Sequence, residues 1–143
     1  MKYLLFYREE TVLENQYVYL TRLLGYYGFQ PIVIDKIGDW PEKNHVFHSI
    51  KSVLADPRFS NLKFVWLDAS GEQCLDEFEH EANNIVYCVG ADIEGFDGIP
   101  AQDLPGEKVR LKQPAGQEGE WYASIVIPLV VYDHYLFVNG RRK

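Results

Sequence analysis

The loop Gly90–Phe96 contains residue types that could carry chemistry. It follows a hydrophobic segment, Asn84–Val89, and has glycines at positions 90 and 95. Glycine allows a close backbone approach and a positive φ, which a ligand-binding loop uses and which a tight turn without a ligand would also need. The three-glycine spacing of a dinucleotide-binding loop is missing, and the acids Asp92 and Glu94 disfavour an anionic phosphate.

Other catalytic and metal-binding patterns in the sequence are incomplete. His45 and His48 are three residues apart, but no third ligand stands at metal spacing nearby, so we predict no metal site. Cys74 and Cys88 have neither metal spacing nor an adjacent histidine, and we expect buried free thiols. The sequence shows no serine elbow, no phosphate loop with a lysine and no basic-aromatic RNA platform.

Apolar periodicity predicts strands that alternate with helices. The predicted strands are Lys2–Tyr7, Pro31–Asp35, Lys63–Leu67, Asn84–Val89 and Lys108–Lys112. The predicted helices are Val12–Tyr27, ending near Gly28, then Val46–Leu54, and a short acidic helix over Gln73–His80. The apolar segment Glu120–Tyr135 is rich in β-branched residues, which leaves both a helix and a buried strand open.

This alternation predicts an α/β protein, a single domain over residues 1–143 with a mainly parallel sheet flanked by helices. Sheets of this kind bind ligands at the carboxyl ends of their strands. The candidate site therefore lies in the loops that follow the predicted strands: Arg8–Glu14, Asp68–Glu72, Gly90–Gly98 and Lys112–Tyr122.

Length and composition favour one soluble domain. The chain has 143 residues, a net charge of −7 and 47% hydrophobic residues, which fits a single sizeable core. Its longest apolar run, within Ser124–Tyr132, is about half of what a bilayer crossing requires. Because Met1–Tyr7 also lacks the length and cleavage site of a signal peptide, we expect a cytoplasmic protein.

The charges are unevenly distributed. No Lys or Arg stands between Lys63 and Lys108, whereas eleven acids do. This segment is either a solvated surface or an acidic interface, and it cannot bind phosphates. Any nucleic acid must approach the basic residues that stand elsewhere: Arg8, Arg22, Lys36, Lys43, Lys51, Arg58, Lys63, Lys108, Arg110, Lys112 and Arg141–Lys143.

Three segments acquire a joint meaning when they are read in order. Arg22–Gly28 closes a helix before a strand, Gly90–Phe96 follows the fourth strand, and Glu120–Ser124 opens the last apolar stretch. Together they resemble the SPOUT superfamily, in particular its tRNA and rRNA ribose 2′-O-methyltransferases. That branch has an arginine six residues before a glycine, a Gly-x-Glu-x-x-Gly-Leu loop and a Ser-Leu-Asn-x-Ser motif. The resemblance covers nearly the whole chain.

The resemblance implies catalytic roles for four residues. Arg22 matches the arginine that assists removal of the ribose hydroxyl proton, and stabilising the developing alkoxide is an equally plausible role for a guanidinium. The alternative for Arg22 is a surface helix residue in a salt bridge. Ser124 matches the family serine, whereas Asp92 replaces a glutamate and Tyr122 replaces the asparagine beside the reacting hydroxyl.

The resemblance also implies S-adenosylmethionine as cofactor. The residues at the matching strand ends and loops are Leu67, Gly90, Leu111 and Trp121. An adenine needs apolar walls and backbone hydrogen bonds, and a sulfonium favours carboxylates without a competing cation, as the base-free segment provides. For Leu67 and Leu111, plain core packing is the alternative.

Two structural features follow only from the resemblance. One is a C-terminal trefoil knot, and the other is a homodimer in which the partner's Arg22 completes each site. The aromatic-rich helix end Tyr132–Phe137 is the candidate dimer surface.

RNA, most simply tRNA, is the implied substrate, and neither DNA nor a membrane is an expected partner. A chain of charge −7 binds RNA poorly unless its bases gather on one side or a basic partner protein delivers the RNA. The alternatives are a catalytically reduced binding or regulatory module and a methyltransferase for a protein or small molecule. Asp92 and Tyr122 favour these alternatives, and Arg22 favours the RNA enzyme.

Overall fold

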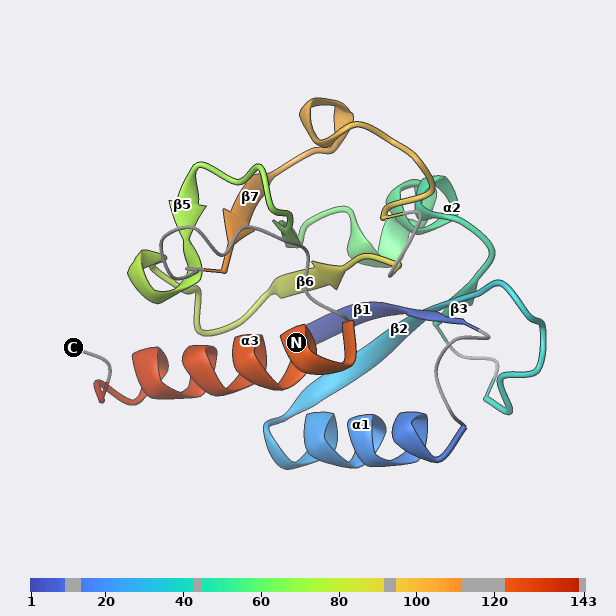
Figure 1. Cartoon of the computed structure of the whole chain (residues 1–143), viewed down its shortest axis with the longest axis horizontal. Coiled ribbons are helices and arrows are strands. Elements are labelled where there is room, and N and C mark those ends of the chain that lie inside the picture. The colour runs from blue at the N-terminus through green and yellow to red at the C-terminus, as the bar shows by residue number, and fades with distance from the viewer. Residues whose placement is uncertain (10–13, 43–44, 92–94, 112–122, 142–143) are drawn as a thin grey trace, which may run out of the picture.

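A seven-stranded parallel sheet forms the centre of the computed structural model, which describes residues 1–9, 14–42, 45–91, 95–111 and 123–141 (Figure 1). The strand order is β3-β2-β1-β6-β4-β7-β5, and every pairing between these strands is parallel. The strands are β1 Lys2–Arg8, β2 Phe29–Asp35, β3 Val46–Phe47, β4 Lys63–Leu67, β5 Gln73–Cys74, β6 Ile85–Val89 and β7 Glu107–Arg110.

Helices cover both faces of this sheet. The α-helices are α1 Glu14–Tyr26, α2 Ile50–Ala55 and α3 Ala123–Val138. Single 3-10 turns form η1 Pro57–Phe59, η2 Leu75–Glu77 and η3 Ala101–Asp103. α1 and α3 lie together on one face, and α2 covers the other (Figure 1). This confirms the predicted parallel sheet flanked by helices.

The alternation of side chains along β1 divides the core between the two faces. Leu4 and Phe6 join the buried cluster under α1 and α3, whereas Tyr3, Leu5 and Tyr7 join the cluster under α2. Neighbouring β6 is buried along its whole length. Strands of this kind are apolar on both faces because helices cover both sides of a parallel sheet.

The five predicted strands are present, with ends that differ by at most two residues. α1 ends just before Gly28, which has a φ of 76° and so lets the chain turn into β2. The last apolar stretch is a helix, α3, rather than a strand. It contains Pro128, whose missing N–H would also interrupt a central strand.

The prediction of one helix over Val46–Leu54 was wrong. Val46 and Phe47 form β3 and pair with the end of β2. The helix α2 starts only after Ser49, whose hydroxyl accepts a hydrogen bond from the Ser52 N–H at 3.2 Å. Pairing with a distant strand thus overrides the local helical spacing, and the hydroxyl cap sets the helix start.

The short acidic helix predicted over Gln73–His80 was also wrong. Gln73–Cys74 is the edge strand β5, and a single 3-10 turn follows it. His80 is buried, and its Nε2 lies 2.6 Å from an Asp133 carboxylate oxygen on α3. The segment follows this long-range contact, which spacing along the chain does not reveal.

Three further observations bear on the sequence expectations. Cys74 and Cys88 are both buried and form no disulfide. In the described part of the chain, no helix has the length and apolar character that a membrane crossing needs. The same residues contain no group of three or more His, Cys, Asp or Glu side chains able to hold a metal ion.

Candidate active site

Three neighbouring strands end together at the candidate site. β4 lies between β6 and β7, and Leu67 at its end pairs with Val89 on one side and with Val109 on the other. Gly90 directly follows Val89, and Leu111 stands two residues after Val109. The topology therefore brings Leu67, Gly90 and Leu111 to one edge of the sheet.

The chain that leaves β6 closes into a loop. The Ala91 N–H donates to the Gly95 carbonyl at 2.8 Å, and the Gly95 N–H donates back to the Ala91 carbonyl at 3.2 Å. A Cβ placed on Gly90 would lie 3.1 Å from the Gly95 carbonyl carbon, and Gly95 itself has a φ of 60°. The close approach of these two residues therefore favours glycine at both positions.

The loop after β4 packs against the end of β7. A Cβ on Gly71 would lie 2.8 Å from the backbone nitrogen of Val109, which is closer than real Cβ contacts. The Asp68 N–H donates to the Val109 carbonyl at 2.9 Å, and Arg110 Nη1 donates to the Gly71 carbonyl at 2.7 Å. Backbone contacts thus fix the loop beside Leu111.

Asp97 anchors the far end of the Gly90 loop. Its carboxylate accepts hydrogen bonds from the Ile50 N–H at 2.7 Å and the Tyr7 hydroxyl at 3.1 Å, and it pairs with Lys36 Nζ at 2.9 Å. Burial alone would raise the pKa of Asp97, but these partners outweigh it and lower the pKa below its ordinary value. A charged carboxylate therefore ties the loop to β1, β2 and α2.

The residues at this edge fit the adenine of S-adenosylmethionine. Leu67 and Leu111 are half-buried and pack against the cluster beneath α1 and α3. Gly90 follows β6, the neighbour of β4 on the side away from β7, and it is partly accessible. An adenine needs apolar walls and accessible backbone groups for hydrogen bonds, so these three residues would hold it.

Arg22 lies on the exposed side of α1. The side of α1 that faces the core carries Tyr17, Leu20 and Leu24, and Arg22 is exposed on the opposite side. Its guanidinium lies 5.9 Å from the centre of the Tyr19 ring. No acidic side chain in the described ranges lies within ion-pair distance of Arg22, so the salt-bridge alternative gains no support.

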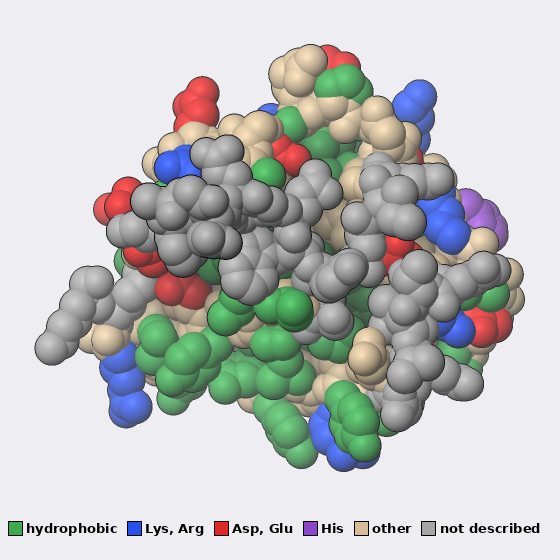
Figure 2. Space-filling model, in the orientation of Figure 1, with side chains coloured by type: hydrophobic (Ala, Val, Ile, Leu, Met, Phe, Trp, Pro, Cys, Tyr) green, Lys and Arg blue, Asp and Glu red, His purple; other side chains and the backbone are tan. Residues whose placement is uncertain are grey.

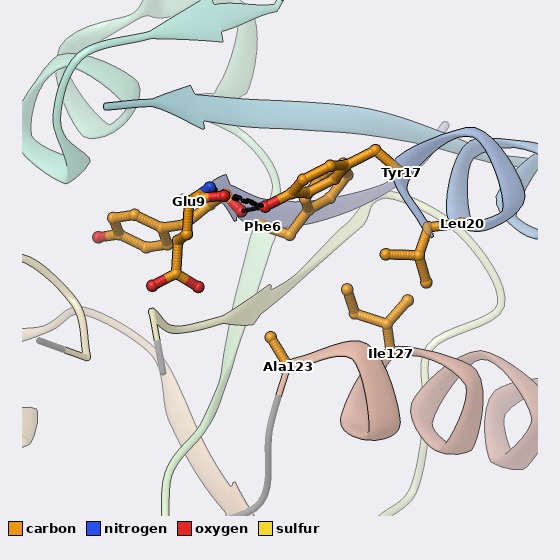
Figure 3. Close-up of a pocket in the computed structure, with 7 residues that line it drawn as sticks. Phe6, Glu9, Tyr17, Leu20, Ala123 and Ile127 are labelled. Carbon is orange, nitrogen blue, oxygen red and sulfur yellow. Dashed lines mark hydrogen bonds between the residues drawn. The ribbon is translucent and has the colours of Figure 1, made fainter. Parts of the chain in front are cut away.

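A hollow lies between the end of β1, α1 and the start of α3 (Figure 3). It is a shallow, open hollow with about 220 Å³ of empty space, open solvent included, and one carboxylate-bearing residue borders an otherwise largely apolar wall. The lining residues are Phe6, Tyr7, Glu9, Tyr17, Leu20, Ala123 and Ile127.

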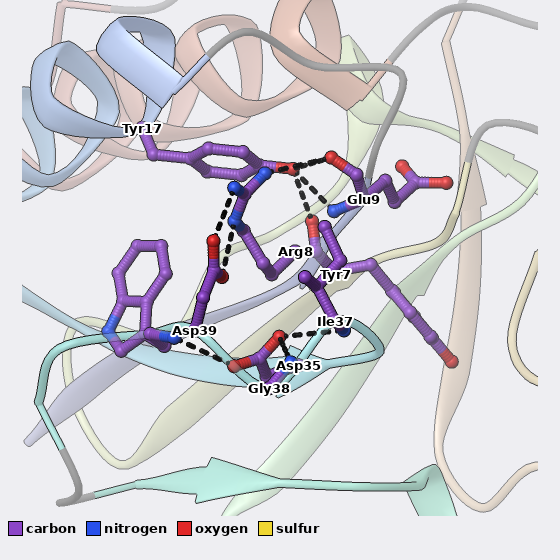
Figure 4. A network of polar contacts seen from close by, with 9 residues as sticks. Tyr7, Arg8, Glu9, Tyr17, Asp35, Ile37, Gly38 and Asp39 are labelled. Carbon is purple, nitrogen blue, oxygen red and sulfur yellow. Dashed lines mark hydrogen bonds and ion pairs between the residues drawn. The ribbon is translucent and has the colours of Figure 1, made fainter.

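A buried polar network surrounds Tyr17 beside this hollow (Figure 4). The Tyr17 hydroxyl donates to the Tyr7 carbonyl at 3.1 Å and accepts the Glu9 N–H at 2.7 Å. The Arg8 guanidinium lies 4.8 Å from the Tyr17 ring centre and donates to the Glu9 carbonyl at 2.9 Å. It also donates to both carboxylate oxygens of Asp39, which raises the pKa of Arg8.

Sequence reasoning missed this network. Tyr17 belongs to the apolar stripe of the first helix, where a core role is the natural interpretation, and Arg8 counts only as one of several bases. The available signal was the position of Arg8–Glu14, since this loop follows the first strand and was among the four predicted to border the site. Which side chains would meet there depends on Asp39, which is 31 positions away from Arg8.

Several predicted site residues cannot be placed. Asp92, Trp121 and Tyr122 lie outside the described residues. Ser124 stands in the first turn of α3, next to Ala123 at the edge of the hollow, and its side chain is outside the described part.

Comparison of the sequence with known proteins finds no relative. No family model matches it, and no curated protein matches it either. The fold, in contrast, has solved counterparts.

A structure described as giving insight into 2-OH methylation of C/U34 on tRNA superposes with a TM-score of 0.74 at 17% identity, over 97% of this chain and 91% of that one. The TrmH/SpoU tRNA modifying enzyme of A. aeolicus matches with a TM-score of 0.67 at 15% identity, over 99% and 76%. An AdoMet-bound rRNA methyltransferase from Sinorhizobium meliloti matches at 0.66 and 13% identity, over 93% and 54%. The chain therefore has the α/β fold found in these RNA-modifying enzymes.

Proposed function

We propose that this chain, which has the fold of SPOUT-type RNA methyltransferases, transfers a methyl group from S-adenosylmethionine to a ribose 2′-hydroxyl of RNA, with tRNA as the substrate. The observation that carries the proposal is the meeting of Leu67, Gly90 and Leu111 at adjacent strand ends in this fold. The AdoMet-bound rRNA methyltransferase of the same fold supports the choice of cofactor.

The chemistry needs a positioned hydroxyl, a route for its proton and an activated methyl group, which the cofactor supplies when bound. Orientation of the reactants supplies much of the rate in such displacements. In this proposal Arg22 stabilises the developing alkoxide, and Asp92, Tyr122 and Ser124 position the acceptor. Trp121 adds a further wall for the cofactor.

We infer that the active form is a homodimer. Arg22 is exposed on the side of α1 opposite the one that faces the sheet, so in this proposal it acts at the site of a partner. Exposed apolar side chains on α1 and α3 form a surface that we call the apolar face (Figure 2), and the Arg22 guanidinium lies 5.9 Å from the ring centre of its member Tyr19. The apolar face consists of Tyr19, Tyr26, Ile125, Leu129, Tyr132, Tyr135 and Val138.

α3 itself favours this interpretation. Its residues Val126, Ile127, Val130 and Val131 are buried against the sheet, yet the opposite side of the helix is also apolar. A helix that is apolar on both sides is normally covered on both sides. A second copy would bury the apolar face and bring the partner's Arg22 to each site.

The RNA must approach away from the acidic segment between Lys63 and Lys108. In the dimer, Arg141, which is exposed just after the end of α3, offers positive charge for the phosphates. A basic partner protein that delivers the RNA would serve the same end. The proposal also includes a cytoplasmic location, one domain over residues 1–143 and the C-terminal trefoil knot.

Two measurements test the function. In calorimetry, S-adenosylmethionine should bind the protein, and Gly90→Val should abolish binding while the melting transition persists. In labelled-methyl transfer to total RNA from cells that lack the protein, Arg22→Ala should lower the rate by at least tenfold. Arg58→Ala, which removes an exposed guanidinium beneath the other face of the sheet, is the matched control. Cofactor binding without RNA labelling would leave a binding module.

A further inference from the structure

We propose that Asp97 is a positioning residue, whose charged carboxylate holds the loop from Gly90 to Gly95 in the shape that binds S-adenosylmethionine. This inference rests on the proposed function and adds a residue that the resemblance does not supply. Asp97 would act through the backbone of Gly95 and Gly90 and not by contact with the cofactor. The observation behind it is a strained turn that one side chain holds in place.

The backbone just after the loop adopts a conformation that favours glycine. Gly95, Asp97 and Gly98 have φ angles of 60°, 56° and 72°. Glycine adopts such angles freely, whereas a residue with a Cβ does so at a cost, which is smaller for aspartate than for most others. Backbone strain of this kind persists where the surrounding contacts impose it, and it is concentrated at functional sites. Asp97 is therefore the residue of this turn that calls for an explanation.

The side chain of Asp97 supplies the contacts that impose this conformation. One carboxylate oxygen accepts the Ile50 N–H at 2.7 Å, which places the turn beside the start of α2 (Figure 1). The other oxygen accepts the Tyr7 hydroxyl at 3.1 Å and lies 2.9 Å from Lys36 Nζ. Burial raises the pKa of Tyr7, and Asp97 raises it further, so the hydroxyl keeps the proton that it donates. The carboxylate is 17% exposed and depends on these partners to remain charged.

Lys36 is itself held in place. Its Nζ donates to the His48 carbonyl at 2.8 Å and lies 5.9 Å from the centre of the Tyr7 ring. The ammonium group therefore has a fixed position in front of Asp97, although the Lys36 side chain is 42% exposed. An ion pair with one nearly buried partner and a fixed geometry is stronger than an ordinary surface pair.

Short backbone connections carry this anchor to the cofactor edge. Gly95, two residues before Asp97, exchanges two backbone hydrogen bonds with Ala91. It also lies against Gly90, where an added Cβ would be 3.1 Å from the Gly95 carbonyl carbon. A displacement of Asp97 therefore moves Gly95, and with it the backbone at Gly90 that would meet the adenine.

A second connection runs through Phe96. This residue is buried between the loop and Asp97 in sequence, and its ring centre lies 4.9 Å from that of Trp66 on β4. Trp66 directly precedes Leu67, another residue of the cofactor edge. Asp97 and Phe96 together fix the turn against both β1 and β4, so the edge is formed before the cofactor arrives. A preformed site binds more tightly because less conformational freedom is lost on binding.

A purely structural role is the alternative, because Asp97 also satisfies the Tyr7 hydroxyl and the first N–H of α2. The two roles predict different measurements. A structural role lowers the melting temperature and leaves the affinity of the folded protein for the cofactor unchanged. A positioning role weakens that affinity at temperatures where the variant is fully folded.

Asp97→Asn keeps the size of the side chain and removes its charge. By calorimetry without RNA, well below the melting temperature, we expect this variant to bind S-adenosylmethionine about tenfold more weakly than wild type. In methyl transfer to tRNA, the KM for S-adenosylmethionine should rise by the same factor, while kcat at saturating cofactor stays unchanged.

Asp56→Asn is the matched control. Asp56, at the other end of α2, likewise accepts a backbone N–H, that of Arg58 at 2.9 Å, and pairs with the Arg58 guanidinium at 2.8 Å. This variant should bind the cofactor as wild type does. Lys36→Met removes the cation of the Asp97 pair and should also weaken binding. The double variant should bind no more weakly than Asp97→Asn alone, because both substitutions remove the same pair.

The outcomes separate this inference from the proposed function. Wild-type binding together with an equally tight Asp97→Asn variant would overturn the role of Asp97, whatever its melting temperature, and so would an equal loss in Asp56→Asn. If Asp97→Asn does not fold, unchanged affinity in Lys36→Met would overturn it. If the wild type binds the cofactor but methylates no RNA, the proposed activity fails and the positioning role still stands on the calorimetry. A wild type that binds no S-adenosylmethionine would overturn both.

Discussion

The guanidinium of Arg8 donates two parallel hydrogen bonds to the carboxylate of Asp39, from Nε at 3.0 Å and from Nη2 at 2.9 Å. The Arg8 side chain is 11% exposed and that of Asp39 is 50% exposed, so the pair joins a nearly buried cation to a partner at the surface. Forked pairs of this kind are the stronger class of ion pair. This one links the end of β1 to the turn after β2.

Asp39→Asn should therefore destabilise the protein by removing the charge opposite a mostly buried cation. We expect the free energy of unfolding to fall by about 1–2 kcal/mol, a range that allows for the exposure of Asp39. Urea unfolding measures this change. Glu81→Gln, at an exposed pair whose atoms are 3.8 Å apart, should change it by less than about 0.5 kcal/mol. Equal effects of the two substitutions would mean that the Arg8 pair is no more than a surface contact.

Tyr17→Phe removes the hydroxyl that connects Tyr7 and Glu9. The loss of hydrogen bonds to two backbone groups should lower the free energy of unfolding by about 1–2 kcal/mol. Tyr26→Phe is the matched control, because Tyr26 lies on the same helix and is 78% exposed. Thermal unfolding of both variants tests the difference, and a Tyr17→Phe protein as stable as the control would argue against a structural role for the hydroxyl.

His134 should make the stability depend on pH. Burial lowers its pKa to about 4 from the ordinary value of 6.5, and nearby His80 and Lys2 act in the same direction against the Glu81 carbonyl and Asp133. Between these two values the unfolded chain binds more protons than the folded one, so stability falls as the pH falls. This histidine accounts for about 3 kcal/mol, fully present above pH 6.5 and lost on acidification toward pH 4.

Urea titrations from pH 4 to 7 measure this dependence. His134→Gln should lower the slope of the unfolding free energy against pH over that range by the equivalent of one bound proton. This holds even if the variant is less stable at pH 7. His48→Gln, at an exposed histidine, should leave the slope as it is in wild type. An unchanged slope in His134→Gln would show that this group does not titrate as described.

Two glycines with different surroundings should respond in opposite ways to alanine. A Cβ on Gly71 would meet the backbone of Val109 at 2.8 Å, so Gly71→Ala should destabilise the protein and weaken cofactor binding. Gly25 lies inside α1 with nothing within 4 Å of an added Cβ. Gly25→Ala should raise the free energy of unfolding by about 0.5–1 kcal/mol. Calorimetric melting of both variants would contradict this account if Gly71→Ala melts at or above the wild-type temperature.

The apolar face should mediate dimerisation. Leu129→Asp places a charge within this face, at a side chain that is 45% exposed and is not part of the buried core. Sedimentation at micromolar concentration should show a dimer for the wild type and a monomer for this variant. A wild-type monomer would contradict the dimer, and with it the role of the partner's Arg22.

The sequence predicted the sheet well because strands buried on both faces are apolar along their whole length, as Ile85–Val89 shows. It failed at Val46–Phe47 and at Gln73–Cys74, two short edge strands whose pairing with distant strands decides their conformation. The sequence also predicted that Leu67, Gly90 and Leu111 stand at strand ends, and the topology brings them to one edge of the sheet, while their role in a site stays a prediction. The buried polar network around Tyr17 and Arg8 could not be predicted from the sequence, since it depends on contacts between residues far apart in the chain.

The most direct test of the central claim is the identity of the methylated product. Purified protein is incubated with S-adenosylmethionine and tRNA from cells that lack the protein, and the nucleosides of the digested tRNA are analysed by mass spectrometry. The account predicts one 2′-O-methylated nucleoside that appears with the wild type and is strongly reduced with Arg22→Ala. A methyl group on a base, or no new methylated nucleoside, would contradict it.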